Sequence, residues 1–205
     1  FRHRNDPVWV RETFPIAKGT ESLFPNPTNV MRFLNLTRRT EIGANCYVLE
    51  LAGKRIVLDA GLHPRLEGAE AMPDFGLLED GSVDAVLLSH AHQDHVGSIP
   101  VLLRRQPQAP LFATEATCRV SEVMLHNSVN VMMSVRTEKG ITDYPLFTHR
   151  ELDSAARRWH PVPLRKPWSL EGERLAPGEN GTAVSFEFYD AGHILGSVGM
   201  MIRGE

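Results

Sequence analysis

Three histidines and an aspartate stand within six positions of this sequence, as His90, His92, Asp94 and His95, directly after an apolar run. Imidazole nitrogen and carboxylate oxygen are common ligands of Zn²⁺, and a catalytic zinc takes three protein ligands and leaves one position for water. Because His90 and His92 alternate, both side chains can point to the same side of an extended segment. The spacing therefore predicts a catalytic metal site rather than a set of surface histidines.

Asp94 and His95 form the second half of this cluster. They follow His92 too closely along the chain to join the same tetrahedron without strain, so the sequence favours a second metal ion nearby. A structural zinc is normally closed by four ligands that include cysteine, but neither Cys46 nor Cys118 has metal-like spacing. Two catalytic zinc ions are therefore the expected cofactors.

Two further residues stand in loops that follow strand-like segments. His193 lies in "AGHILGS", whose glycines let the backbone approach another loop, and we expect it to be the third ligand beside His90 and His92. Asp59 ends "RIVLDAG" and is expected to accept a ring N–H from a ligating histidine, with a structural capping role as the alternative. Weaker candidates near the same loops are Asp190 and His63.

The apolar pattern predicts short strands, then helices, then strands again. Residues 83–89, "VDAVLLS", are apolar enough for a strand that is buried on both faces. The order of elements predicts a layered α/β sandwich, with the histidine cluster just past the carboxyl end of a strand, where ligands gather in such sheets. The expected strands are 31–37, 45–52, 54–60, 83–89, 110–114, 184–190 and 197–203, the expected helices are 99–107, 115–132 and 149–160, and the expected turns are 52–54 and 174–184.

The composition predicts one domain, because 205 residues with 42% hydrophobic content can bury one substantial core. Residues 1–30 are rich in proline and are expected to be an extension that wraps the domain or stays mobile. The net charge of −3 gives no global attraction to nucleic acid, and the basic excesses in 1–40 and 150–166 are interpreted first as solvated faces. Two cysteines outside any disulfide framework, and no apolar run near the ~20 residues of a membrane span, predict a cytoplasmic protein without membrane association.

With these residues placed, the sequence resembles the metallo-β-lactamase fold and, within it, the β-CASP nucleases. Asp59, the motif 90–95 and His193 match the first three metal-site motifs of that superfamily in order. Segments 110–128 and 147–164 are similar to those that β-CASP proteins carry between the second and third motifs. "AGHILGS" resembles the cleavage-and-polyadenylation endonuclease type and its bacterial and archaeal relatives, whereas "EIGANCYVLE" resembles ribonuclease J.

The resemblance implies an α/β fold, the αββα sandwich, with residues 31–205 as the N-terminal part of a metallo-β-lactamase domain. A bridging aspartate, the β-CASP domain and further histidines, one of them a proton donor, are expected beyond Glu205. The fold is therefore predicted to be incomplete at its C-terminus, and the activity of this chain alone is left open.

The activity that the resemblance implies is zinc-dependent hydrolysis of phosphodiester bonds, with single-stranded RNA as the expected substrate. The carboxylates expected to act in catalysis are Asp94, which would help to hold the nucleophile as well as a metal, and Asp59. Endonucleolytic or exonucleolytic mode, base preference and assembly as a homodimer are left open.

Two alternatives remain at this point. A small-ester or thioester hydrolase would use the same zinc pair on an acyl carbon, but the helical segments between 115 and 160 argue against a compact enzyme of that kind. A non-catalytic RNA-processing subunit would be expected to have lost ligands, and all those expected before residue 205 are present.

Overall fold

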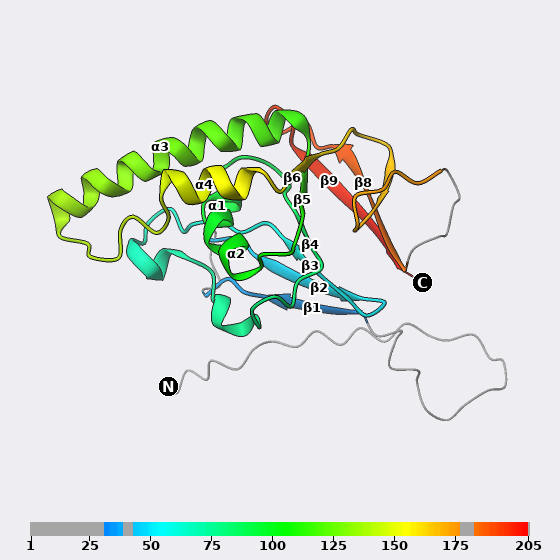
Figure 1. Cartoon of the computed structure of the whole chain (residues 1–205), viewed down its shortest axis with the longest axis horizontal. Coiled ribbons are helices and arrows are strands. Elements are labelled where there is room, and N and C mark those ends of the chain that lie inside the picture. Colours follow the sequence, from blue (N-terminus) through cyan, green and yellow to red (C-terminus); the bar gives the residue numbers. More distant parts are fainter. Residues whose placement is uncertain (1–30, 39–42, 177–182, 205) are drawn as a thin grey trace, which may run out of the picture.

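The computed structural model describes residues 31–38, 43–176 and 183–204. The predicted extension 1–30 and the middle of the predicted turn 174–184 lie outside the described residues. The described residues form three layers: helices, a six-stranded sheet and a three-stranded sheet (Figure 1). The second helical layer of the predicted αββα sandwich is not formed by the residues that the structure describes.

The larger sheet has the order β1-β2-β3-β4-β5-β6, and the smaller has the order β7-β8-β9. Their strands are β1 Arg32–Asn35, β2 Tyr47–Leu51, β3 Lys54–Leu58, β4 Ala85–Leu87, β5 Leu111–Ala113, β6 Trp159–Pro161, β7 Pro167–Ser169, β8 Val184–Asp190 and β9 Val198–Gly204. The helices are η2 Gly68–Ala71, η3 Phe75–Leu77, α1 Gln93–Val96, α2 Ile99–Arg105, α3 Glu115–Lys139 and α4 His149–Ala156.

Strand pairing changes once within the larger sheet, from antiparallel to parallel at β3. β1, β2 and β3 pair antiparallel, and the turn between β2 and β3 places Ala52 and Gly53 at φ 48° and 73°. Positive φ at both turn residues is what a two-residue hairpin requires, so the predicted turn at 52–54 is confirmed. From β3 to β6 all pairs are parallel, which brings the carboxyl ends of β3, β4 and β5 to one edge of the sheet.

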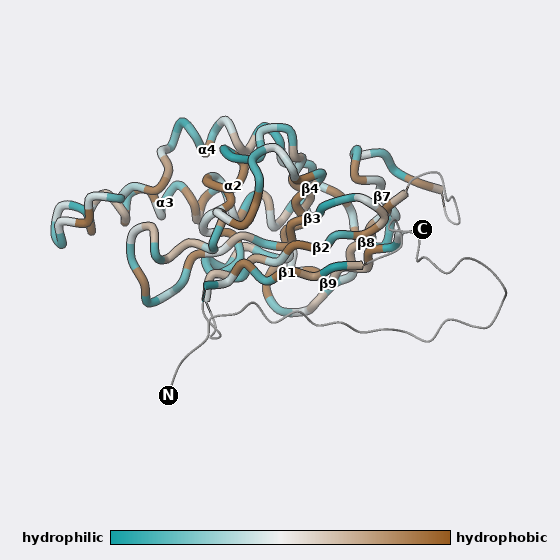
Figure 2. The backbone as a smooth tube through the Cα atoms, turned by 90° about the horizontal axis from the view of Figure 1, so that it is seen from below, coloured by the Kyte–Doolittle hydropathy of each residue, from teal (hydrophilic) through white to brown (hydrophobic). Residues whose placement is uncertain are grey.

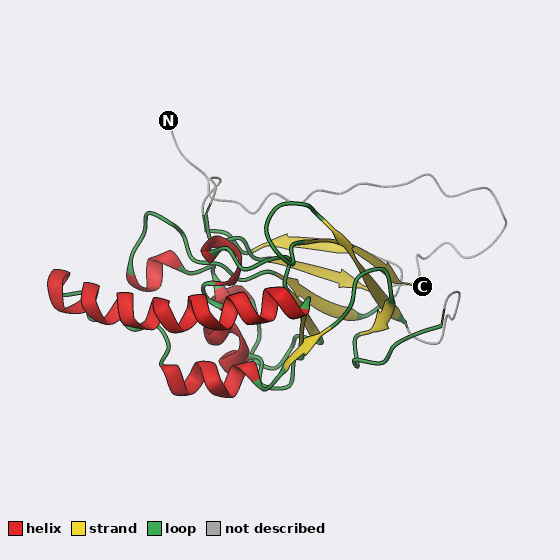
Figure 3. Ribbon diagram, turned by 90° about the horizontal axis from the view of Figure 1, so that it is seen from above, coloured by secondary structure: helices red, strands yellow, loops and turns green. Residues whose placement is uncertain are grey.

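The alternation of side chains along each strand divides the interior into two cores. In β4, Val86 faces the helices, whereas Ala85 and Leu87 face the smaller sheet. All three are fully buried, which confirms the predicted strand with two buried faces. Figure 3 separates the red helices from the yellow strands, and Figure 2 shows brown, hydrophobic segments gathered where the strands lie.

Two helices carry the capping signals that their sequences provide. The Thr114 side chain accepts a hydrogen bond at the start of α3, and Gly140 ends the helix in the left-handed conformation. α3 is therefore longer than the predicted 115–132 and reaches Lys139. Thr148 and Glu151 form a capping box at the start of α4.

The predicted helix 149–160 is wrong at its C-terminal end, because α4 stops at Ala156. The backbone then turns into β6, where Trp159 pairs with Leu111 of β5 in parallel register. Arg158 donates to the carbonyls of Leu103 and Gln106 at the end of α2, at 2.8 and 2.9 Å. Arg158 therefore serves the fold, and burial lowers the pKa of its guanidinium, so the basic segment 150–166 is only partly a solvated face.

Both cysteines are free thiols, as predicted, and both are buried. Burial raises the pKa of Cys118 to about 12 and raises that of Cys46 further. Among the helices of the described residues, none combines the length and the apolar character that crossing a membrane requires.

Leu87→Ala should destabilise the protein by about 2–5 kcal/mol, since it removes a fully buried side chain between the two sheets. Leu77→Ala is the matched control, because Leu77 is 57% exposed and its truncation should stay within about 0.5 kcal/mol. Urea unfolding followed by circular dichroism measures both changes. Equal losses for the two variants would contradict the described core between the sheets.

Candidate metal centre

The site forms where the parallel strands β3 and β4 end side by side. Asp59 directly follows β3, and its backbone N–H donates to the carbonyl of Leu87 in β4 at 3.0 Å. Ser89 and His90 follow β4 two residues further on. The two strand ends therefore deliver a carboxylate, a hydroxyl and an imidazole to one point on the sheet edge.

Three imidazoles meet at this edge, one of them from a distant part of the chain. The nitrogen His92 Nδ1 lies 3.1 Å from His90 Nε2 and 3.2 Å from His193 Nε2. Two ligands of a tetrahedral zinc with Zn–N bonds of about 2.0–2.1 Å lie about 3.3 Å apart, so these separations fit a shared ion. The structure thus brings together the three residues that the sequence grouped, and this cluster could hold a metal ion.

The hydrogen-bond network determines which nitrogen of His90 is available. The Ser89 hydroxyl donates its single proton to Asp59 Oδ2 at 2.7 Å, so it can only accept from His90 Nδ1, 2.8 Å away. This network assigns the proton of His90 to Nδ1 and leaves a lone pair on Nε2. The free lone pair is the one that faces His92.

Asp59 is the common acceptor of this network. Its carboxylate accepts from the Ser89 N–H at 2.7 Å, from the Ser89 hydroxyl, and from His95 Nδ1 at 2.7 Å. Asp59 also has φ 60°, a left-handed conformation that Asp tolerates better than most residues. Its carboxylate therefore lies where the sequence expected it, against the ring N–H of a histidine of the motif.

Asp94 and His95 lie on α1 as an adjacent pair, outside the group of three imidazoles. His95 Nε2 is 3.6 Å from Asp94 Oδ2, so the two ligand atoms converge on the same small volume. The side-chain amide nitrogen of Asn45 lies 3.2 Å from Asp94 Oδ2 and 3.1 Å from His95 Nε2. Nitrogen and carboxylate oxygen at this spacing suit a second ion, which would replace the Asn45 amide at the one lone pair of His95 Nε2.

Two residues of this site were missed by sequence reasoning. Ser89 could have been recognised as a polar residue that ends an apolar strand directly before the first histidine. Asn45 stands at the start of an ordinary strand-like run and gives no comparable signal. Its position depends on backbone hydrogen bonds with Asp94 and Gly61, both distant in sequence.

The pKa values of His90 and His95, which both lie near Asp59, are shifted in opposite directions. Burial, with a contribution from the neighbouring His95, lowers the pKa of His90 to about 4. Burial also lowers the pKa of His95, but the hydrogen bond to Asp59 and the charge of that carboxylate outweigh it, so the pKa is raised. An ion therefore meets less competition from protons at His90 than at His95.

The two weaker site candidates that the sequence suggested, Asp190 and His63, accept hydrogen bonds from residues close to them in the chain. Asp190 Oδ1 accepts the N–H of Gly192 at 2.9 Å, and His63 Nδ1 accepts the N–H of Arg65 at 3.1 Å. Neither belongs to the cluster of three imidazoles. Of the other described histidines, His126 and His149 bond to each other at 2.8 Å, and His160 lies against Phe112.

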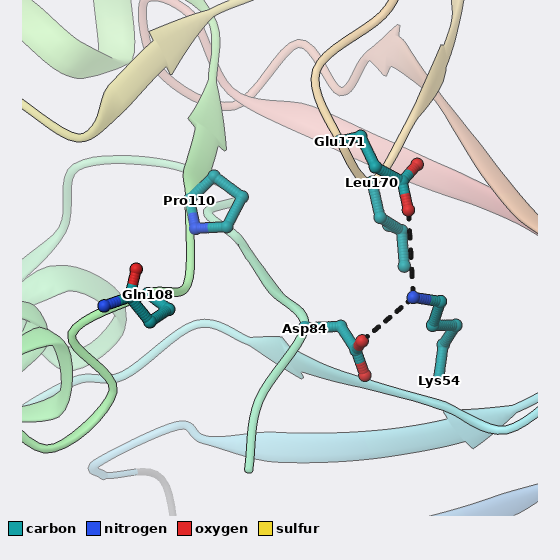
Figure 4. A pocket seen from close by; sticks show the side chains of 6 residues that line it. All are labelled: Lys54, Asp84, Gln108, Pro110, Leu170 and Glu171. Atoms are coloured by element: carbon teal, nitrogen blue, oxygen red, sulfur yellow. Dashed lines mark hydrogen bonds and ion pairs between the residues drawn. The ribbon is translucent and has the colours of Figure 1, made fainter. Parts of the chain in front are cut away.

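A shallow pocket of about 420 Å³ lies at the opposite edge of the sheet, at the amino ends of β3, β4 and β5. Lys54 lies between two carboxylates there, 3.1 Å from Asp84 and 3.7 Å from Glu171 (Figure 4). One ammonium against two carboxylates leaves an excess negative charge, so the pocket offers no free cation to an anionic ligand.

Comparison with known proteins identifies the family. The family model of the metallo-β-lactamase superfamily matches residues 39–117. An archaeal metallo-β-lactamase superfamily protein from Sulfolobus tokodaii has the same fold, with a TM-score of 0.50 and 18% identity, over 86% of this chain and 61% of that one. Residues 39–117 therefore match the metallo-β-lactamase superfamily, as the motifs predicted, and the described residues share its fold.

The similar curated proteins include ribonucleases. Endoribonuclease Ysh1 of Schizosaccharomyces pombe is 31% identical over 173 residues, which are 84% of this chain and 21% of that protein. A ribonuclease of Thermus thermophilus is 33% identical, over a match that covers 85% of this chain and 36% of that ribonuclease. Cleavage and polyadenylation specificity factor 73 of Drosophila melanogaster is 28% identical, over a match that covers 91% of this chain and 25% of that factor. The chain thus spans about a fifth to a third of these relatives, and the predicted likeness to cleavage-and-polyadenylation nucleases is confirmed.

Gly61→Ala should disrupt the second ligand pair. A Cβ at Gly61 would lie 1.7 Å from the carbonyl oxygen of Asp94 and 2.6 Å from the backbone nitrogen of His95, so the backbone itself would have to move. We expect a loss of about 1–3 kcal/mol in unfolding free energy together with a loss of bound metal.

The matched control is Gly199→Ala, because a Cβ there meets no atom within 4 Å. Urea unfolding and elemental analysis should leave this variant within about 0.5 kcal/mol of the parent protein, with the same metal content. A Gly61→Ala protein with unchanged stability and metal content would show that the described close approach is wrong.

In the metal-free protein, His90 should remain neutral as the pH falls from 7 to 5.5, because its pKa is about 4. A histidine with a lowered pKa binds fewer protons in the folded than in the unfolded state. Its contribution to stability is therefore present above the ordinary pKa and is lost as the pH falls toward 4. Ring proton resonances in NMR spectra, assigned with His90→Gln, measure this, and a midpoint above pH 6 would refute the described burial.

Proposed function

We propose that this chain is the metal-binding part of a zinc-dependent hydrolase that cleaves phosphodiester bonds in single-stranded RNA. The observation that carries the proposal is the convergence of three imidazole nitrogens, at 3.1 and 3.2 Å, beside the Asp94 and His95 pair. The relatives named as ribonucleases support RNA as the substrate. The buried free thiols of both cysteines support a reducing compartment, and we place the protein in the cytoplasm.

His90, His92 and His193 would hold the first zinc, and Asp94 and His95 would contribute to the second. Bound zinc supplies Lewis acidity and lowers the pKa of a coordinated water toward neutrality. The open side of the site faces solvent, because His193 is exposed whereas His90 is only 8% exposed. A long polymer can therefore approach the site from the side of His193.

The protein's own groups prepare this site before a substrate arrives. Asp59 orients His95 directly and His90 through Ser89, so two ligating nitrogens keep their lone pairs directed away from the sheet. Asp94 is partly exposed and can accept a hydrogen bond from the attacking water, which orients that water toward the phosphorus atom. The Nε2 atom of His95 lies 3.6 Å from the same carboxylate, close enough for both to bind one ion.

RNA cleavage by the full-length protein tests the proposal, with elemental analysis of the same preparation. The wild-type protein should contain zinc and cleave a labelled single-stranded RNA. His92→Ala should lose that zinc and reduce cleavage by more than about 100-fold. Replacing a residue that only hydrogen-bonds to a metal ligand already lowers metal affinity or activity by about 10–100-fold. The matched control is His160→Ala, an exposed histidine on β6, which should retain both properties.

The two alternatives give different results in this experiment. A thioester or small-ester hydrolase would contain zinc, cleave an acyl substrate and leave the RNA intact. A non-catalytic subunit would contain no stoichiometric zinc. Either result would overturn the proposed nuclease.

A further inference from the structure

The third ligand of the cluster is held by a loop that begins a hundred residues after the other two. His193 lies between β8 and β9, and hydrogen bonds within the loop shape it. The Ser197 hydroxyl accepts the N–H groups of His193 and Ile194, each at 3.1 Å, and the Ser197 N–H donates to the carbonyl of Ile194 at 2.9 Å. These bonds determine the form of the loop, but they do not place it against the other ligands.

The first turn of α3 makes the contact that places the loop. Thr114 Oγ1 and Thr117 Oγ1 each lie 2.8 Å from the carbonyl oxygen of Gly196. Thr114 and Thr117 are three residues apart, so both hydroxyls lie on the same side of the turn. Thr117 is fully buried and Thr114 is 8% exposed, so little water reaches these bonds.

Gly196 is packed too closely against this turn to carry a side chain. A Cβ would lie 2.6 Å from Thr114 Oγ1 and 2.7 Å from the backbone nitrogen of Thr117, and the residue has φ +85°. The close approach is what lets both hydroxyls reach the carbonyl of Gly196. A second connection, from the Val198 N–H to the Ser89 carbonyl at 2.9 Å, joins the end of the loop to the strand end at the site.

We infer that Thr117, together with Thr114, is a positioning residue that fixes the His193 loop to the N-terminus of α3 and thereby sets the geometry of the third metal ligand. Thr114 also caps α3, so its replacement would destabilise the helix itself. Thr117 is the sharper test, because its hydroxyl donates to Gly196 without capping the helix. The predicted change in metal affinity rests on the proposed metal site. The predicted contact between Thr117 and the loop does not.

Thr117→Val keeps the shape of the side chain and removes its hydroxyl. In the metal-free protein, amide hydrogen exchange in 193–198 should become about three- to tenfold faster, the effect expected for one lost hydrogen bond. Cobalt affinity, measured by competition with a chromophoric chelator, should weaken by a similar factor. Thr117→Ser restores the hydroxyl and should return both values to those of the wild type.

Thr137→Val is the matched control, because Thr137 lies on the same helix and its hydroxyl bonds only to the carbonyl of Met133. This variant should match the wild type in both measurements. If Thr117→Val fails to fold, Thr117→Ala is read in the same way. Wild-type exchange and wild-type cobalt affinity in Thr117→Val, or in Thr117→Ala in its place, would overturn the inference.

The two measurements separate this inference from the proposed function. A wild-type protein that binds no cobalt would refute the proposed metal site. Amide exchange in the metal-free Thr117 variants would still decide whether the hydroxyl holds the loop.

Discussion

The site depends most on the hydrogen bonds that the Asp59 carboxylate accepts at the edge of the larger sheet. One carboxylate bonds to the Ser89 N–H, to the Ser89 hydroxyl and to the ring N–H of His95. Hydrogen bonds to a charged group are worth about 1.5–3 kcal/mol each, so this single residue orders the end of β4 and two imidazoles. Parallel pairing of β3 with β4 makes this possible, because it brings the two strand ends together.

Close backbone packing brings the second ligand pair to the same edge. Gly61 touches the backbone of Asp94, and the Gly61 N–H donates to the carbonyl of Asn45 at 3.0 Å. Asn45 in turn donates from its backbone to the carbonyl of Asp94 at 2.9 Å. The loops before β2, after β3 and after β4 are thereby joined through main-chain groups, which are less mobile than side chains. These main-chain hydrogen bonds therefore fix the positions of Asp94 and His95 relative to the larger sheet.

The site is asymmetric in its exposure and in its proton affinity. His90 is buried and resists protonation, whereas His193 is exposed at the outer side. His95 holds its proton more strongly because it bonds to Asp59. Protons therefore compete less with an ion at His90 than at His95.

The sequence by itself determined which residue types meet at the site and most of the elements that carry them. The spacing of the motif 90–95 and the strand before it are local features, and a glycine-flanked His193 after an alternating strand is also visible locally. The apolar pattern likewise predicted most of the strands, but not β6 and β7, because burial depends on side chains that repeat along the chain. The resemblance to the metallo-β-lactamase superfamily followed from these same motifs.

The tertiary structure decided which groups support the ligands. Asn45 lies beside Asp94, Arg158 bonds to the end of α2, and Thr117 bonds to Gly196, in each case across dozens of residues. The end of α4 and the formation of β6 were also decided by pairing with β5 rather than by helical periodicity. Contacts of this kind depend on the path of the backbone in space, and an isolated polar residue carries no periodic signal that reveals its distant partner.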